Sequence, residues 1–146
     1  MKTTLTVEES QRLIELGVDP KLASMVSWKQ TETWARKSIL SNEEHLTLKP
    51  FRPMVMGFER FETKDVFTLT DILIILPKSY FSEEHFAEMV LSIEVCDNKW
   101  FANYRYYCGG ELAGQDVERE APELIETLYQ LVIWCLENKI IKLKES

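Results

Sequence analysis

MVLSIEVCDNKWFANYRYYC, residues Met89 to Cys108, gives the clearest indication of how this chain folds. Apolar and aromatic side chains alternate with polar ones on both sides of a short polar segment at Asp97-Asn98-Lys99. Such alternation on either side of turn-forming residues is typical of two antiparallel strands. We therefore expect a β-hairpin with strands at Met89–Cys96 and Trp100–Cys108.

The register of this hairpin follows from the pairing that gathers apolar side chains on one face. We expect Val95 to pair with Ala102, because one face is then apolar or aromatic along both strands. Further pairs on that face are Ile93–Tyr104, Leu91–Tyr106 and Met89–Cys108. The other face carries the polar pairs Glu94–Asn103 and Ser92–Arg105. A shift by one residue would turn Arg105 toward the core. The expected register also excludes a disulfide between Cys96 and Cys108.

The polar face of the second strand is the candidate binding surface. It carries two aromatic rings, an amide and a guanidinium: Phe101, Asn103, Arg105 and Tyr107. Because Tyr, Phe and Arg are enriched where proteins meet, we interpret these four residues as a protein contact. The alternative is that another strand or loop buries them. Flexible apolar side chains at Met54–Phe58 form a second candidate surface, for which core filling is the alternative.

Helices are expected on both sides of the hairpin. Thr6 and Glu9 form a capping-box pattern that begins a helix ending at Leu16, and Asp19-Pro20 opens a short second one. The other helices are expected at Thr68–Leu76, which Pro77 ends, and from Pro122 to Asn138.

The remaining segments complete an α+β fold. Alternation at Ser27–Lys29 and at Leu46–Leu48 predicts one or two short strands within residues 26–65. Residues 109–121 are expected to form a mobile acidic loop. We thus expect a small antiparallel sheet of three or four strands, with helices packed mainly on one face.

Composition predicts one globular domain spanning residues 1–146. Apolar residues make up 45% and charged residues 28%, which is ordinary for a folded chain. The formal net charge is −7, and residues 68–146 hold the whole excess, with seven Lys/Arg against fourteen Asp/Glu. A negative field repels phosphate backbones and anionic lipids. We therefore expect neither a nucleic-acid partner nor a membrane partner.

The cellular location is predicted from two segments. Residues 1–9 lack the apolar core of a signal peptide. The longest uncharged apolar run, Thr127 to Leu136, is about half as long as a membrane span. We expect a cytoplasmic protein whose three cysteines are reduced, buried thiols: Cys96, Cys108 and Cys135.

Residue types that carry catalysis or bind metals form no familiar motif. His45 and His85 are the two imidazoles, and His85 with Glu88 makes at most half of a metal site. The sequence contains no G-x-S-x-G pattern of a nucleophile elbow. Gly109-Gly110 is not expected to bind phosphate, because acids rather than Lys or Ser/Thr follow it. We expect no catalytic residue, no cofactor and no metal.

Three segments together resemble a known group of proteins: LTVEESQRLIELGVDP at Leu5–Pro20, FTLTDILIILPK at Phe67–Lys78 and ELIETLYQLVIWCLENK at Glu123–Lys139. They are similar to an uncharacterised family of short proteins from gut-bacterial prophages and other mobile elements. The resemblance implies a bacterial cytoplasmic accessory protein with no assigned activity. No functional residue is carried over from it.

The leading hypothesis is a non-enzymatic accessory protein that binds a host or phage protein, and a homo-oligomer is also compatible with the sequence. The alternative is a small-molecule binding or minor enzymatic domain with a pocket between the sheet and the C-terminal helix. Its candidate polar groups are Tyr104, Arg105 and Glu94. A DNA mimic is a third interpretation, which rests only on the acidic C-terminal half.

Overall fold

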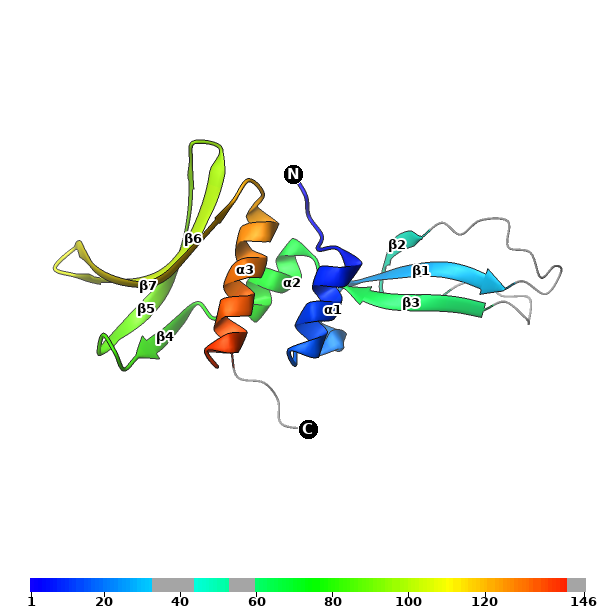
Figure 1. Ribbon diagram of the computed structural model, residues 1–146, viewed down its shortest axis with the longest axis horizontal. Helices are drawn as coiled ribbons and strands as arrows, with labels where there is room; N and C mark the ends of the chain where they lie inside the picture. Colours follow the sequence, from blue (N-terminus) through cyan, green and yellow to red (C-terminus); the bar gives the residue numbers. More distant parts are fainter. Residues whose placement is uncertain (33–43, 53–59, 142–146) are drawn as a thin grey trace. The chain divides into compact units, whose positions relative to one another are not determined.

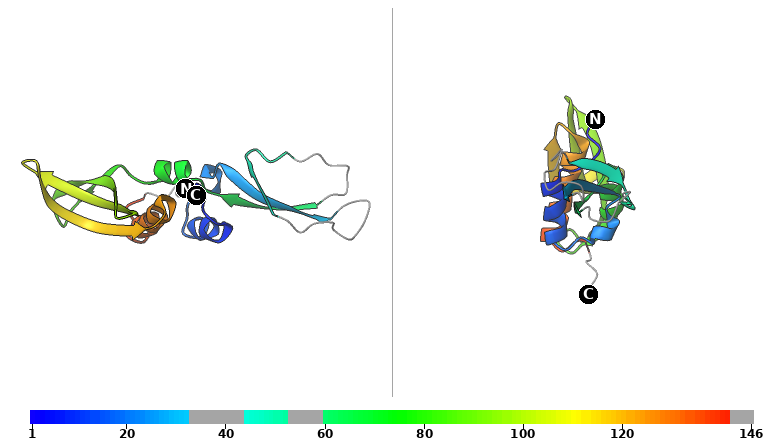
Figure 2. Two further views of the ribbon diagram at one scale, coloured as in Figure 1. Left: turned by 90° about the horizontal axis from the view of Figure 1, so that it is seen from above. Right: turned by 90° about the vertical axis from the view of Figure 1, so that its right-hand side faces the viewer.

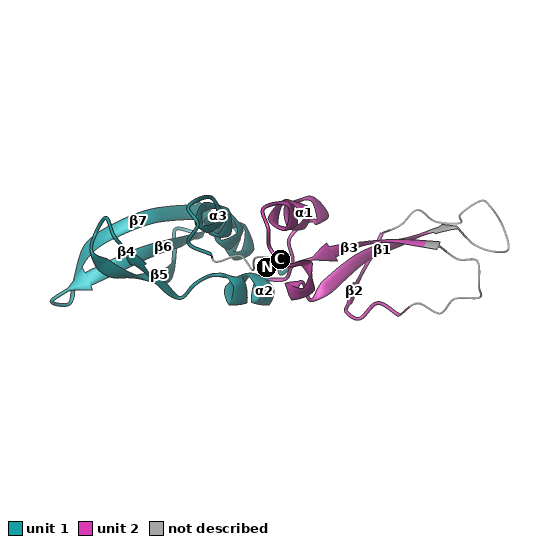
Figure 3. Cartoon of the chain, turned by 90° about the horizontal axis from the view of Figure 1, so that it is seen from below, with its two compact units in different colours: residues 1–3, 69–146 teal, residues 4–68 magenta. Residues whose placement is uncertain are grey.

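The computed structural model describes residues 1–32, 44–52 and 60–141 (Figure 1). The chain divides into two compact units (Figure 3). We call residues 4–68 the N-terminal unit, and residues 1–3 together with 69–146 the C-terminal unit. The described residues form three α-helices, a three-stranded sheet and a four-stranded sheet. The predicted α+β class is therefore confirmed, with two small antiparallel sheets in place of one.

The N-terminal unit combines a helix with a three-stranded antiparallel sheet of order β2-β1-β3. Its elements are α1 (Val7–Glu15), a 3-10 turn η1 (Pro20–Leu22), β1 (Met25–Glu32), β2 (His45–Leu48) and β3 (Arg60–Val66). Leu13 of α1 is fully buried together with Val26, Val66 and Phe67. These side chains form the core of this unit.

The first predicted helix is confirmed, including the capping box at its N-terminus. The Thr6 hydroxyl accepts a hydrogen bond from the Glu9 amide at 3.1 Å, and the Glu9 carboxylate accepts one from the Thr6 amide at 3.0 Å. Gly17 follows with φ of 110°, a left-handed conformation that glycine adopts without strain. The second helix is shorter than predicted, because Asp19 caps only η1 and β1 begins at Met25.

The strands expected near Ser27 and Leu46 are confirmed as β1 and β2. The third strand, β3, was not predicted, because RFETKDV has few apolar residues. Lys29 pairs with Glu62 in the β1–β3 ladder, and their side chains form an ion pair at 3.6 Å. Charged cross-strand pairs thus contribute to a strand that apolar periodicity cannot identify.

The C-terminal unit contains an antiparallel sheet of order β4-β5-β6-β7 and two helices. Its elements are α2 (Leu69–Ile75), β4 (Ser79–Ser82), β5 (Ala87–Cys96), β6 (Lys99–Cys108), β7 (Glu111–Ala121) and α3 (Leu124–Glu137). Helix α3 packs against β6, β7 and α2 (Figure 1). The two predicted helices of this unit are confirmed, slightly shorter at their ends.

The predicted hairpin is present as β5 and β6, but its register is shifted by two residues. Ile93 pairs with Ala102, and Leu91 pairs with Tyr104. The cause is the turn: Asp97 and Asn98 have φ of 52° and 63°, as in a two-residue type I′ turn, so Cys96 pairs with Lys99. Because side chains alternate with a period of two, this shift leaves each residue on its predicted face.

The two faces of this sheet have different surroundings. We call the face that carries Tyr104 the inner face and the face that carries Arg105 the outer face. On the inner face, Met89, Ala102 and Tyr104 are fully buried, and α3 covers them with Leu128 and Cys135 among its buried side chains. Burial does not continue to the tip of the hairpin, where Val95 is 61% exposed. The prediction of an apolar core along the whole hairpin is wrong at that end.

Residues 111–121 are a strand, so the expected mobile acidic loop is wrong. Gly109 and Gly110, with φ of 62° and 84°, make a two-residue turn from β6 into β7. Register shifts after Tyr104 and after Tyr106 leave Asp116 and Ala113 as extra residues of β7. Such β-bulges bend a strand, and β7 curves along its length (Figure 2). They also break the alternation by which a strand is recognised in sequence.

The cysteines differ from the prediction in their exposure. All three are free thiols, but Cys96 and Cys108 are exposed and only Cys135 is buried. Within the described ranges, no helix combines the length and apolarity needed to cross a membrane.

Candidate functional site

The four residues predicted as a protein contact all lie on the outer face, because they occupy alternate positions of β6. Their exposure differs. Tyr107 is exposed, Phe101 is partly exposed, and Asn103 is fully buried. The Arg105 side chain is only 15% exposed. Two of the four, Phe101 and Tyr107, therefore present rings to solvent.

Arg105 is bound within its own sheet. Its guanidinium forms ion pairs with Glu94 of β5 and, at 3.4 Å, with Glu118 of β7, while its Nε donates to Gln115 at 2.8 Å. Glu118 pairs with Asn103 in the β6–β7 ladder. The guanidinium thus reaches along the sheet across the row of Asn103, which is itself fully buried.

The outer face also exposes apolar side chains that sequence analysis did not identify. Tyr107 (55% exposed) is joined there by three residues of the other strands: Phe81 (54%), Val90 (48%) and Leu112 (52%). Phe81 of β4 contacts Phe86 with ring centroids 5.5 Å apart. Phe81 and Leu112 were missed because β4 was not predicted and β7 was taken as a loop. Val90 lies in the predicted first strand of the hairpin but was not singled out.

The alternative hypothesis placed a ligand pocket on the inner face, between the sheet and α3. Tyr104 fills this space: its ring lies 5.0 Å from Tyr80 and 6.3 Å from Trp134, centroid to centroid. Its hydroxyl donates to the Pro77 carbonyl at 2.7 Å and lies 3.8 Å from Cys135 Sγ. Tyr104 and the pair Arg105–Glu94 point to opposite faces. The three polar groups proposed for a pocket therefore do not converge.

Burial determines the protonation of these inner groups. Burial, with the nearby Cys135 thiol adding to it, raises the pKa of Tyr104 well above its usual value. Burial also raises the pKa of Cys135 to about 11, although its hydrogen bond with Tyr104 lowers it in part. Both groups are neutral at neutral pH. Since the thiolate is the nucleophile, Cys135 is an inert thiol.

A second polar cluster lies near the β4–β5 turn. The carboxylate of Asp116, on β7, accepts a hydrogen bond from the Tyr80 hydroxyl and lies 2.6 Å from His85 Nε2. Burial and this hydrogen bond to Asp116 raise the pKa of Tyr80 far above its usual range. Glu84 also reaches the cluster. Sequence analysis missed it because Asp116 is 31 positions from His85 and lies on the strand that was predicted as a loop.

The other residues singled out in the sequence do not join this cluster. Glu88, the predicted partner of His85, pairs with Phe81 and lies on the outer face. His45 belongs to the N-terminal unit, where its ring stacks on Trp28 at 4.5 Å. The candidate surface at Met54–Phe58 lies outside the described residues.

Fold and site together define a class: a small α+β protein with two antiparallel sheets, an outer face with exposed rings and a His–Asp–Tyr cluster. Comparison of the chain with protein-family models, curated proteins and solved structures found no match. The function must therefore be argued from these residues.

Proposed function

We propose that this protein is a non-enzymatic accessory protein of a bacterial cytoplasm that binds another protein through the outer face of its four-stranded sheet. The observation that carries the proposal is the set of apolar side chains left about half exposed there: Phe81, Val90, Tyr107 and Leu112. Burying apolar surface against a partner is favourable, and exposed rings of this kind are enriched at interfaces.

The charge of the outer face limits the kind of partner. Four exposed acidic residues lie on it: Glu88, Glu94, Glu118 and Glu120. Arg105 is already paired with two of them, so it offers little to an acidic partner. The partner that fits best has an apolar centre and a rim of Lys and Arg. We further propose that this partner is a host or phage protein.

The packing of the inner face favours protein binding over the small-molecule alternative. Tyr104, Leu128 and Cys135 are fully buried between the sheet and α3. A ligand in this space would have to displace side chains that form the core. The outer face needs no such rearrangement to be used.

The test uses a variant with both Phe81→Ser and Tyr107→Ser. Affinity purification from a bacterial host first identifies a protein that the tagged wild-type chain captures. Calorimetry with the purified pair should then show at least a tenfold weaker Kd for the double variant. Since both side chains are exposed, its free energy of unfolding should change by less than about 1 kcal/mol.

Val95→Ser is the matched control, because Val95 is 61% exposed in the same sheet but lies on the inner face. It should bind like wild type, whereas Glu120→Lys should weaken binding by reversing an outer-face charge. Undiminished binding by the double variant contradicts the proposal. If light scattering shows a dimer that the double variant abolishes, the partner is a second copy of this chain.

A further inference from the structure

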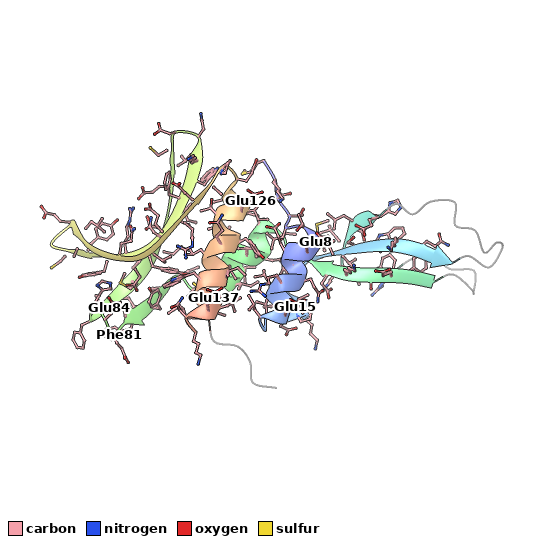
Figure 4. The ribbon with its side chains drawn as sticks, viewed as in Figure 1. Glu8, Glu15, Phe81, Glu84, Glu126 and Glu137 are labelled. Carbon is pink, nitrogen blue, oxygen red and sulfur yellow. The ribbon has the colours of Figure 1, made fainter. Side chains whose placement is uncertain are left out.

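Three side chains that can donate to a metal ion converge on one point of the C-terminal unit. Glu84 and His85 come from the turn between β4 and β5, and Asp116 comes from the middle of β7. One donor atom from each lies within 4.8 Å of the other two. Figure 4 labels Glu84 beside Phe81, near that turn. The sheet thus brings together residues that lie 31 positions apart in the chain.

Local structure holds the His85 side of this cluster. The backbone amide of His85 donates to the buried Ser82 hydroxyl at 3.3 Å, which fixes the turn. The imidazole packs on Tyr106, with ring centroids 5.4 Å apart. Gly114 lies against the Tyr106 ring so closely that a β-carbon at this position would overlap it. The imidazole is therefore supported on one side by a ring that is itself confined.

The other side of the cluster is the β-bulge of β7. Asp116 is the extra residue between Gln115, which pairs with Arg105, and Val117, which pairs with Tyr104. Bulges re-aim side chains and are frequent next to functional sites. Here the bulge directs one carboxylate oxygen of Asp116 to Tyr80 and the other to His85. Metal-ligating carboxylates are commonly oriented by such a hydrogen bond from a neighbouring group, as Tyr80 supplies here.

We propose that Glu84, His85 and Asp116 bind a divalent transition-metal ion of the zinc class. His85 Nε2 and Asp116 Oδ1 are the first two ligands, Glu84 is the third, and water completes the coordination. The imidazole decides the kind of ion, because Mg²⁺ and Ca²⁺ prefer ligand sets made of oxygen alone. This site is separate from the outer face and does not depend on the function proposed for it.

The geometry needs only a small adjustment to accept an ion. His85 Nε2 and Asp116 Oδ1 are 2.6 Å apart. Two ligands of a tetrahedral zinc ion, each about 2.0–2.1 Å from the metal, lie roughly 3.3 Å apart. The two atoms would have to move apart by under about 1 Å, and side-chain rotation supplies a movement of this size. Glu84 is exposed and can close on the ion from solvent.

The experiment is calorimetric titration of the full chain with zinc chloride. A variant with Cys96→Ser and Cys108→Ser is the parent protein, because these exposed thiols could bind zinc themselves. We expect one ion per chain, and a Kd weakened at least tenfold by either His85→Gln or Glu84→Gln. Magnesium chloride should give no binding. His45→Gln is the matched control, since His45 is the other imidazole and should leave binding unchanged.

Failure to fold is separated from loss of the ion by Glu84→Gln, which alters an exposed side chain. Zinc should raise the Tm of the parent protein and leave the Tm of His85→Gln unchanged. Zinc binding that both variants retain at full affinity would overturn the proposal, because the ion would then be bound elsewhere. Absence of binding at millimolar zinc would also overturn it, and the contact between His85 and Asp116 would then only fix the turn.

Discussion

At the scale of single residues, Asn103 combines complete burial with an unsatisfied side chain. Its amide nitrogen and oxygen have no hydrogen-bond partner among the residues that the structure describes. A buried polar group without a partner costs about 1–3 kcal/mol. The residue lies at the centre of the outer face, between Phe101 and Arg105, where binding is proposed. The unsatisfied amide thus lowers stability on the face that the proposed function uses.

We predict that Asn103→Val raises the free energy of unfolding by about 1–2 kcal/mol, because it removes the unsatisfied amide and suits a strand. Urea denaturation followed by circular dichroism measures the change. Asn103→Ala is the control: it also removes the amide but leaves a void, so it should be less stable than the valine variant. A valine variant less stable than wild type would show that the amide is satisfied, for example by buried water.

Tyr104 gives the protein a predicted sensitivity to alkali. Its pKa is raised by burial in the folded state and is near 10 when unfolded. As the pH rises, the unfolded chain therefore loses the Tyr104 proton before the folded protein does. The contribution of Tyr104 to stability is thus complete below pH 10 and falls as the pH rises further. The decrease is at most about 1.4 kcal/mol per pH unit for one group.

Urea denaturation of wild type and Tyr104→Phe from pH 8 to pH 11 measures this effect. The difference between their free energies of unfolding should shrink above pH 10, because phenylalanine does not titrate. A constant difference between wild type and Tyr104→Phe up to pH 11 would contradict the assigned burial effect.

At the scale of elements, the helices were predicted from signals that lie close together in the sequence. The capping box of Thr6 and Glu9 and the apolar stripe of α3 are written within a few residues, and both helices form. The register of β5 and β6 was wrong by two residues, because turn geometry at Asp97-Asn98 overrides the apolar pairing. Faces were nevertheless predicted, since a shift of two preserves them.

The candidate sites were predictable only in part, for a related reason. Phe101 and Tyr107 were placed on the outer face from alternation alone. The cluster at His85 depends on Asp116, which a β-bulge in β7 directs toward it. Sequence alternation carries no signal for a bulge of this kind, and the pairing of β7 with β6 is set by tertiary structure.

The bend of β7 leads to a prediction for Gly114. A β-carbon there would overlap the Tyr106 ring, so Gly114→Ala should destabilise the fold by about 1–3 kcal/mol. In a Tyr106→Leu background the same substitution should cost less, because the ring is gone. Urea denaturation of the four proteins forms a double-mutant cycle. Equal costs in both backgrounds would show that the overlap with Tyr106 is not the cause.

At the scale of the whole molecule, charge is divided unequally between the two units. The C-terminal unit holds eight Lys/Arg against fourteen Asp/Glu, a net charge of −6, and the N-terminal unit nine against ten, a net charge of −1. Four of these acids lie on the outer face, beside its exposed apolar side chains. A field of this sign speeds the approach of a basic partner. The excess of acidic residues thus lies in the unit that carries both proposed sites.

The two units are expected to unfold together. The sequence predicts a single domain, and a unit of about 65 residues buries too little apolar surface to be more than marginally stable alone. We therefore expect one transition, in which nuclear magnetic resonance signals of Leu13 and Leu128 disappear at the same urea concentration. Leu128→Ala should lower stability by about 2–5 kcal/mol, because Leu128 is fully buried in α3. In a single cooperative domain that substitution lowers both midpoints equally, and Leu13→Ala does the same from the other unit. If each substitution shifts only the midpoint of its own unit, the chain consists of two domains.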